Sequence, residues 1–415
     1  MKIREWFEGT KVQNHPAWLR RLIKDPFSVP PIYCEVSPAG GCNHRCLHCA
    51  PSILEFKYNY LSLPVLTRFF GEARELREAD PDGLGIRSVQ FAGEGEPMLE
   101  PQLGKICEQA RIAGIDVGML SNGVAFTEKR AEEVLPFINV YLQFSVNAGT
   151  AESYANFHQV DPGDWSRLWD NIRRVARIKR ELKSKCEVGV NMTVTVKGAL
   201  NKKGARVKAN WPEAEALIQR TRDAGADYVC FKPYRQPPQN RETFELYGDM
   251  SYEPIMDEIL ETGERLRERY ETDDFEVVFR FSRFKEYEMP DRGYPVCHAT
   301  PTLWCYMQSD GLLVSCSGHW LPASKMAQWR ESQFYLGNIK EQGFREIWFG
   351  ERREQHLESM KTFDISVCTK SCHPDHENRY LYWLLNLQPE EQEAELRRLE
   401  ANLAAKGFPH RGNII

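Results

Sequence analysis

Short apolar runs alternate with longer segments of helical periodicity between residues 30 and 282. Seven runs rich in β-branched and aromatic residues predict strands, at residues 32–36, 88–92, 116–120, 140–145, 188–194, 228–231 and 275–281. The segments between them repeat apolar residues every three or four positions, which keeps one helix face apolar, as in Leu168, Ile172, Val175, Ile178 and Leu182. This repetition predicts an α/β fold, in which a parallel sheet is closed or partly closed as a barrel and the functional loops follow the strand ends.

The pattern changes near residue 291. A hairpin is predicted over 302–315 with its turn at 309–311, followed by a helix over 344–361, a cysteine pair and a helical region over 378–405. Before the first strand, only one short amphipathic helix is predicted, over 17–24. We therefore expect a helical extension at 1–29, an α/β barrel at 30–290 and a small α+β domain at 291–415.

The composition fits a globular protein with a sizeable core. Its 415 residues suit two or three packed units, and 42% of them are hydrophobic and 27% charged. The 54 Lys and Arg against 59 Asp and Glu give a net charge of −5, which provides no bulk attraction to nucleic acid or to a membrane surface. The sequence contains neither an apolar run of membrane-spanning length nor an apolar signal region, so we expect a cytoplasmic protein with no nucleic-acid or membrane partner.

Twelve cysteines change this picture because they cluster. In a cytosolic chain they are expected to be reduced thiols. Three lie within residues 42–49 and five in the last third of the chain, whereas Cys107, Cys186 and Cys230 are scattered as buried single cysteines are. The clustering indicates metal sites.

The first group follows the first predicted strand in the spacing C-x3-C-x2-C, at Cys42, Cys46 and Cys49. Three thiolates on one loop suit a four-iron cluster, and three ligands for four irons leave one iron open to bind a substrate or cofactor. The alternative is a zinc site that adds either His44 or His48, although zinc sites usually form from two separated pairs.

This triplet resembles the signature of the radical S-adenosylmethionine (SAM) superfamily, in which an aromatic residue or His commonly precedes the third cysteine, here His48. The resemblance covers roughly residues 30–245 and implies a partial (β/α)6 barrel followed by a smaller domain. The turn after the second predicted strand is similar to the family's GGEP segment, which holds the amino group of SAM. Gly95, Glu96 and Pro97 match that segment, and Glu94 departs from it.

The same resemblance implies that short polar residues at later strand ends line a SAM pocket: Ser121, Asn122, Ser145, Asn147 and Asn191. Ser and Asn are also common in turns, so both interpretations stay open. In the family, SAM binds the open iron of a [4Fe–4S] cluster and is cleaved to a 5′-deoxyadenosyl radical that abstracts hydrogen from the substrate. A flavodoxin- or ferredoxin-type reductant is the implied partner.

The C-terminal cysteines resemble those of the SPASM domain and of its one-cluster relative, the Twitch domain. The resemblance implies that Cys297, Cys316, Cys368 and Cys372 hold a second, auxiliary [4Fe–4S] cluster that accepts or relays the substrate's second electron. Cys305, on a predicted hairpin strand, is the reserve ligand, because single cysteines in strands are often buried. A zinc site is the alternative, since separated cysteine pairs also bind zinc.

Basic residues follow three predicted strands at the barrel rim: Lys197, Lys202, Lys203, Arg206, Lys208, Lys232, Arg235, Arg241, Arg280, Arg283 and Lys285. Such an excess of cations on an acidic protein favours an anionic small-molecule substrate, such as a phosphate ester or nucleotide sugar. For residues 197–208, a solvated lysine loop is the alternative. Lys232 and Arg235 are positional candidates for a catalytic base, although helix capping or a surface position is the more common role for each.

The expected reaction is the two-electron oxidation of a small, carbohydrate-like or anionic substrate, as in aminocyclitol dehydrogenases with one auxiliary cluster. Residues 372–380 and 408–415 also resemble the endings of SPASM-type proteins of carbohydrate pathways. The alternatives are a sugar epimerase with Cys230 or Cys305 as hydrogen donor, a dehydratase, a peptide-modifying maturase and a non-catalytic iron–sulfur electron carrier.

Overall fold

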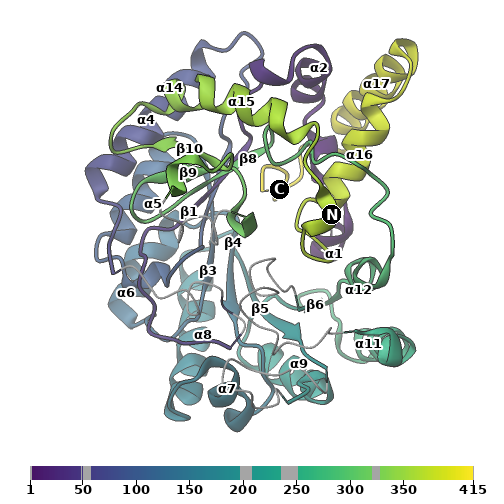
Figure 1. Ribbon diagram of the computed structural model, residues 1–415. Coiled ribbons are helices and arrows are strands. Elements are labelled where there is room, and N and C mark those ends of the chain that lie inside the picture. The colour runs from purple at the N-terminus through teal and green to yellow at the C-terminus, as the bar shows by residue number, and fades with distance from the viewer. Residues whose placement is uncertain are drawn as a thin grey trace.

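Seven parallel strands in chain order form the centre of the computed structural model, which describes residues 2–47, 49, 58–196, 208–234, 251–319 and 328–414 (Figure 1). They are β1 (Tyr33–Val36), β2 (Ser88–Phe91), β3 (Asp116–Ser121), β4 (Tyr141–Ser145), β5 (Glu187–Val194), β6 (Tyr228–Pro233) and β7 (Glu276–Phe279). Each predicted strand is present, so the α/β class and the parallel order are confirmed. The last strand is shorter than predicted, because the backbone turns at Arg280 and Phe281 begins a helix.

Amphipathic helices cover the outside of these strands (Figure 1). They are α4 (Leu63–Ala79), α5 (Leu103–Ile112), α6 (Glu128–Val134), α7 (Ala151–His158), α8 (Gly163–Glu181), α9 (Ala214–Asp223), α11 (Met256–Tyr270) and α12 (Phe281–Glu288). In α8 the predicted apolar face is buried from Leu168 to Ile178. Leu182 does not belong to that face, because the helix ends at Glu181 and the Leu182 side chain is about half exposed.

The predicted C-terminal hairpin extends the same sheet. Strand β8 (Trp304–Met307) pairs in parallel with β1, and β9 (Leu312–Val314) and β10 (Tyr335–Asn338) add two antiparallel strands beyond it. Gly311 closes the hairpin turn with a φ of 92°, a conformation that favours glycine. The smaller domain is thus joined to the barrel through its strand edge.

The C-terminal helices are more interrupted than predicted. The helix expected over 344–361 is divided into α14 (Phe344–Trp348) and α15 (Glu351–Met360), and the last helical region into α16 (Asp375–Leu385) and α17 (Pro389–Lys406). The second break precedes Pro389, because a proline disfavours helical backbone at the residue before it.

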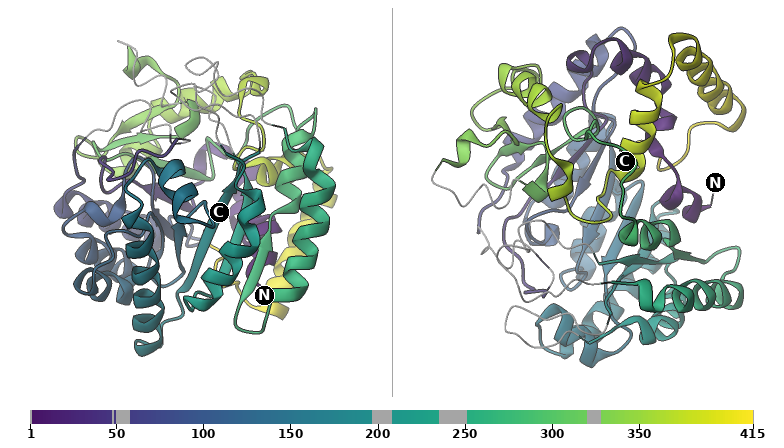
Figure 2. Two further views of the ribbon diagram at one scale, coloured as in Figure 1. Left: turned by 90° about the horizontal axis from the view of Figure 1, so that it is seen from below. Right: turned by 45° about the vertical axis from the view of Figure 1, so that its right-hand side comes forward.

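The N-terminal segment contains a helix that the sequence pattern did not predict. This helix, α1 (Ile3–Glu8), packs against β7, where the Glu276 carboxylate accepts hydrogen bonds from two of its backbone N–H groups at 2.8 and 3.2 Å. The predicted helix is present as α2 (Pro16–Lys24) and contacts α17. Helices α2 and α17, from opposite ends of the chain, therefore lie side by side at one flank of the barrel (Figure 2).

Residues 408–414 pack into the barrel at the amino ends of its strands. Arg411 is buried, forms an ion pair with Glu187 and lies over the rings of Tyr141 and Tyr228 at 4.9 Å. Ile414 is also buried, and a side chain at Gly118 would meet it at 2.9 Å. Among the described residues, the helices lack the combination of length and hydrophobicity required to cross a bilayer.

Candidate active site

The first cysteine group occupies the loop after β1, as predicted. Backbone hydrogen bonds fix this loop to the end of α7: Arg45 N–H donates to the carbonyl of His158 at 3.1 Å, and Leu47 N–H to that of Phe157 at 3.0 Å. Burial raises the pKa of Cys42 and of Cys46, and the charge of Cys49 raises both further. His48 lies outside the described residues.

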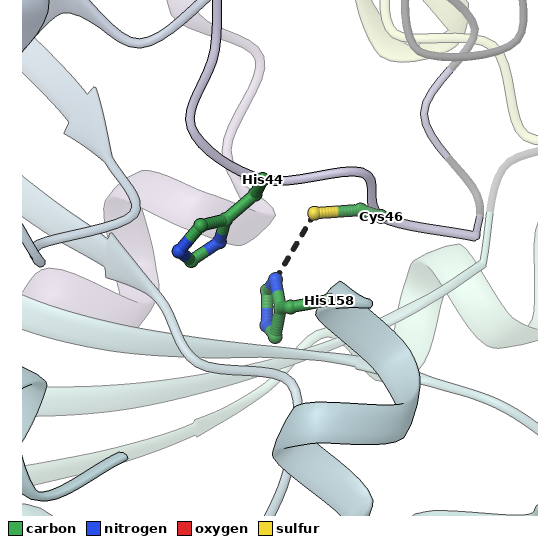
Figure 3. A group of neighbouring side chains, drawn as sticks. All are labelled: His44, Cys46 and His158. Atoms are coloured by element: carbon green, nitrogen blue, oxygen red, sulfur yellow. Dashed lines mark hydrogen bonds between the residues drawn. The ribbon is translucent and has the colours of Figure 1, made fainter. Parts of the chain in front are cut away.

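Cys46 contacts a histidine that sequence reasoning missed. The Nδ1 atom of His158 lies 3.0 Å from Cys46 Sγ (Figure 3). The Nε2 atom donates to the carbonyl of Val146 at 2.8 Å. Ligand atoms of His44, Cys46 and His158 lie within 4.8 Å of one another. Only contact through the tertiary structure identifies His158, since it is more than one hundred residues away along the chain.

The GEGEP turn after β2 lies directly against the cysteine loop. A Cβ on Gly95 would be 2.2 Å from the Gly41 carbonyl oxygen and 2.4 Å from that of Ala39, so only glycine allows this approach. Glu96 N–H donates to the same Gly41 carbonyl at 2.9 Å. Pro97 begins the short helical turn that follows.

The carboxylate of Glu96 connects this turn to the end of β3. It is buried and accepts hydrogen bonds from Ser121 Oγ and Asn122 N–H, both at 2.7 Å, and from Met98 N–H at 3.0 Å. The Asn122 amide then donates to the side-chain oxygen of Asn43 at 2.6 Å. Three of the predicted SAM-pocket residues are thereby joined to the cysteine loop.

The remaining pocket candidates meet where β4 and β5 lie side by side. Ser145 pairs in register with Asn191, and the Asn147 side-chain oxygen accepts from Thr193 N–H at 2.8 Å and from the Asn191 amide at 3.4 Å. Asn147 has a φ of 57°, a left-handed conformation that Asn tolerates better than most residues. These bonds hold the two strand ends together, and a role in binding SAM stays a prediction for all three.

The second cysteine group surrounds a cavity of about 50 Å³ in the C-terminal domain, which Cys297, Cys316, Cys368 and Cys372 all line. The Asn378 amide donates to Cys297 Sγ at 3.3 Å. Burial, together with the charges of two of the other thiols, raises the pKa of Cys368 to about 12.

The reserve ligand lies elsewhere. Cys305 is buried on β8 opposite Cys34 of β1 and does not line the cavity. The structure therefore brings together the four cysteines chosen from sequence and separates the fifth from them.

A larger cavity of about 310 Å³ occupies the barrel interior. It is lined by residues of β1 to β6 and β8 and by segments from both ends of the chain, and Lys232 is among its lining residues. The other catalytic candidate, Arg235, lies outside the described residues, as do the predicted rim cations at 197–206 and Arg241. Arg280 and Arg283 line the cavity, whereas Lys208 is exposed and paired with Glu152 at 2.7 Å.

Comparison with protein families identifies both halves of this arrangement. The model of the radical SAM superfamily matches residues 36–199, and the model of the SPASM iron–sulfur cluster-binding domain matches residues 297–373. The chain belongs to the radical SAM superfamily. As a radical SAM enzyme with a SPASM domain, it uses SAM, a [4Fe–4S] cluster and an auxiliary iron–sulfur cluster.

The following relatives share between 14% and 23% sequence identity with this radical SAM enzyme. The AdoMet-dependent heme synthase of Methanosarcina barkeri (strain Fusaro / DSM 804) is 23% identical over 318 residues, which cover 74% of this chain and 79% of the relative. Streptococcus suis SuiB bound to S-adenosylmethionine superposes with a TM-score of 0.57 at 14% identity, over 84% of this chain and 72% of SuiB. For anSMEcpe with bound AdoMet, the TM-score is 0.51 at 15% identity, over 91% and 98% of the two chains. At these identities the solved structures establish the fold alone.

The donor atoms of both cysteine groups fit iron–sulfur clusters. Burial raises the pKa of Cys42 to about 12 and also raises that of Cys46 well above its ordinary value, so these thiols become thiolates only when positive metal replaces their protons. The same holds for Cys368 in the second group. Buried, converging thiols of this kind match the thiolate ligands that such clusters require.

Proposed function

We propose that this enzyme removes one hydrogen atom and a second electron from a small, carbohydrate-like or anionic alcohol, and releases the corresponding ketone. Within it, we assign Cys42, Cys46 and Cys49 to the SAM-binding cluster and the four cysteines of the C-terminal cavity to the auxiliary cluster. The domain boundaries proposed are 1–29, 30–290 and 291–415. When bound, SAM and its cluster supply the 5′-deoxyadenosyl radical, and the auxiliary cluster supplies an electron acceptor.

The SAM pocket is proposed to comprise Gly95, Glu96, Pro97 and the polar residues at the ends of β3 to β5, with His48 beside the cluster. Three hydrogen bonds fix the carboxylate of Glu96. Its oxygens can still accept a further hydrogen bond from an ammonium group. A buried, charge-assisted contact of this kind orients SAM and keeps water from it.

One observation supports the second electron transfer above all others. Tyr306, Ser317 and His373 line both the barrel cavity and the cavity of the four C-terminal cysteines. Only one layer of side chains therefore separates a substrate in the barrel from the proposed auxiliary cluster. Such a short separation favours loss of an electron from the substrate over return of a hydrogen atom to it.

The overall reaction balances. The substrate carbon loses a hydrogen atom, its hydroxyl loses a proton to a base, and the remaining electron leaves, which converts the alcohol to a ketone. Lys232 lines the cavity and is retained as a candidate base. An external reductant provides the electron that cleaves SAM to methionine and 5′-deoxyadenosine.

The test is anaerobic turnover of candidate sugars and aminocyclitols, with product mass and 5′-deoxyadenosine measured together. We expect a product two mass units lighter than the substrate, and one deuterium in 5′-deoxyadenosine when the reacting carbon is deuterated. The double variant Cys368→Ala with Cys372→Ala should lose ketone formation and retain SAM cleavage. Cys305→Ala is the matched control, because this buried thiol does not line the cysteine cavity.

Other outcomes would contradict the oxidation. A product of unchanged mass that contains solvent deuterium establishes an epimerase, and loss of water establishes a dehydratase. Ketone formation at the wild-type rate in the double variant would exclude the auxiliary cluster as the acceptor.

A heme-type substrate is the second candidate, because the curated relative is a heme synthase. The cations of the barrel cavity suit the carboxylates of a tetrapyrrole as well as a sugar phosphate. Absorbance titration with an iron porphyrin tests this directly. A peptide substrate, as in SuiB bound to precursor peptide SuiA, would instead be indicated by copurification with a small protein.

A further inference from the structure

The barrel cavity has a strongly asymmetric charge distribution. Four cations line it, Lys11, Lys232, Arg280 and Arg283, against a single carboxylate, Glu35. The cations lie at the ends of β6 and β7 and on the N-terminal segment, whereas Glu35 lies on β1. One wall of the cavity is therefore positive.

Carboxylates behind this wall offset part of its charge, since Glu286 forms an ion pair with Arg283 at 3.3 Å. Burial and the charges of Arg280 and Arg283 lower the pKa of Lys11 to about 7, although Glu377 acts in the opposite direction. Burial and Arg283 likewise lower the pKa of Arg280 to about 10, in spite of Glu8. The environment of both groups thus favours an additional negative charge.

Two buried donors in the cavity also need an acceptor. Arg280 donates from Nη2 to the Phe7 carbonyl at 3.0 Å, but among the described residues its Nε has no hydrogen-bond partner. The same is true of Nε2 of Gln143 on β4. Because buried donors are nearly always paired, both indicate a ligand with oxygen acceptors.

The opposite wall suits an uncharged polar group. Glu35 accepts a hydrogen bond from the Gln90 amide at 2.9 Å, and Gln90 in turn accepts one from the Tyr141 hydroxyl. Glu35 and Gln90 are on β1 and β2, which lead to the cysteine loop and to the Glu96 turn. The part of a substrate on this side is the part nearest the proposed radical chemistry.

We propose that Lys11, Arg280 and Gln143 form a binding site for the phosphate or carboxylate of the substrate, which directs its hydroxyl-bearing end toward Glu35 and Gln90. This inference rests on the proposed function, because only that function makes the bound molecule a substrate. Arg283, which is paired with Glu286, lies at the same wall. Lys11 comes from the N-terminal segment, outside the strands on which the sequence placed the site.

The experiment is calorimetric titration of the reconstituted holoenzyme, with SAM present and reductant absent. Glucose, glucose 6-phosphate and glucuronate serve as probes, since they share a ring and differ in charge, and inorganic phosphate tests the anion alone. We expect at least one anionic sugar to bind at least tenfold more tightly than glucose. The stronger of the two anionic sugars identifies phosphate or carboxylate as the preferred group.

In the variant Lys11→Met, the ratio of the Kd for glucose to the Kd for the anionic sugar should fall about tenfold. Lys208→Met is the control, because Lys208 is exposed and outside the cavity, and it should retain the preference. If Lys11→Met fails to fold, as judged by iron content and circular dichroism, Gln143→Leu carries the same expectation.

Equal binding of the three sugars, or an unchanged preference in a folded Lys11→Met or Gln143→Leu protein, would overturn the proposal. Because no turnover takes place, this result is independent of whether the enzyme oxidises, epimerises or dehydrates its substrate.

Discussion

Replacement of Gly95 by alanine tests whether the GEGEP turn must touch the cysteine loop. A Cβ at this position would lie 2.2 Å from the Gly41 carbonyl oxygen, and an ordinary contact begins near 3.4 Å, so the two loops must separate by about 1.2 Å. The obstructing atoms are backbone atoms immediately before Cys42, which no side-chain rotation can move aside.

The separation has two consequences. It breaks the hydrogen bond from Glu96 N–H to the Gly41 carbonyl, which contributes about 0.5–1.5 kcal/mol. It also shifts Glu96 relative to the proposed cluster ligands, and a displacement of about 1 Å at a reacting centre reduces rates roughly 100-fold. We expect Gly95→Ala to weaken SAM binding about tenfold and to slow 5′-deoxyadenosine formation about 100-fold.

The assays are equilibrium binding of SAM and anaerobic single turnover, with thermal unfolding as a check on the fold. Gly71→Ala is the matched control, because Gly71 lies within α4 and a Cβ there meets nothing within 4 Å. That control should be more stable by about 0.5–1 kcal/mol, since alanine favours the helix. Wild-type SAM affinity and rate in Gly95→Ala would refute the argument that contact between the loops organises the site.

Three further results are expected. Reconstituted protein should contain about eight irons, and about four when Cys42, Cys46 and Cys49 are alanine; a wild-type count near four together with zinc would contradict the two-cluster assignment. Glucuronate binding should weaken as pH rises through about 7, because Lys11 is charged below its pKa and neutral above it, and Lys11→Met should abolish this pH dependence. Arg411→Met should lower the free energy of unfolding in urea by about 1–3 kcal/mol, since it leaves the partly buried Glu187 carboxylate unpaired; a change below about 0.5 kcal/mol would show that this ion pair is dispensable.

The sequence by itself determined the positions of the seven barrel strands, the parallel sheet and the positions of both cysteine groups. Parallel strands are buried on both faces, so their apolar runs stand out from the chain around them. The spacing of Cys42, Cys46 and Cys49 is equally local, because one loop places all three sulfur atoms. The resemblance of Gly95 and Glu96 to the family's GGEP segment is also visible in the sequence, because that segment is a single turn.

Only the tertiary structure decided which distant residues meet. His158 reaches Cys46 because α7 ends beside the cysteine loop, and no spacing in the sequence records that contact. In the sequence, Lys11 belongs to a short polar segment. In the fold, that segment packs against the barrel and places Lys11 at the barrel cavity. Cys305 was separated from the other four C-terminal cysteines because β8 joins the barrel sheet, where its partner is Cys34. Local patterns fix elements and short loops, whereas such long-range contacts arise only when the elements pack.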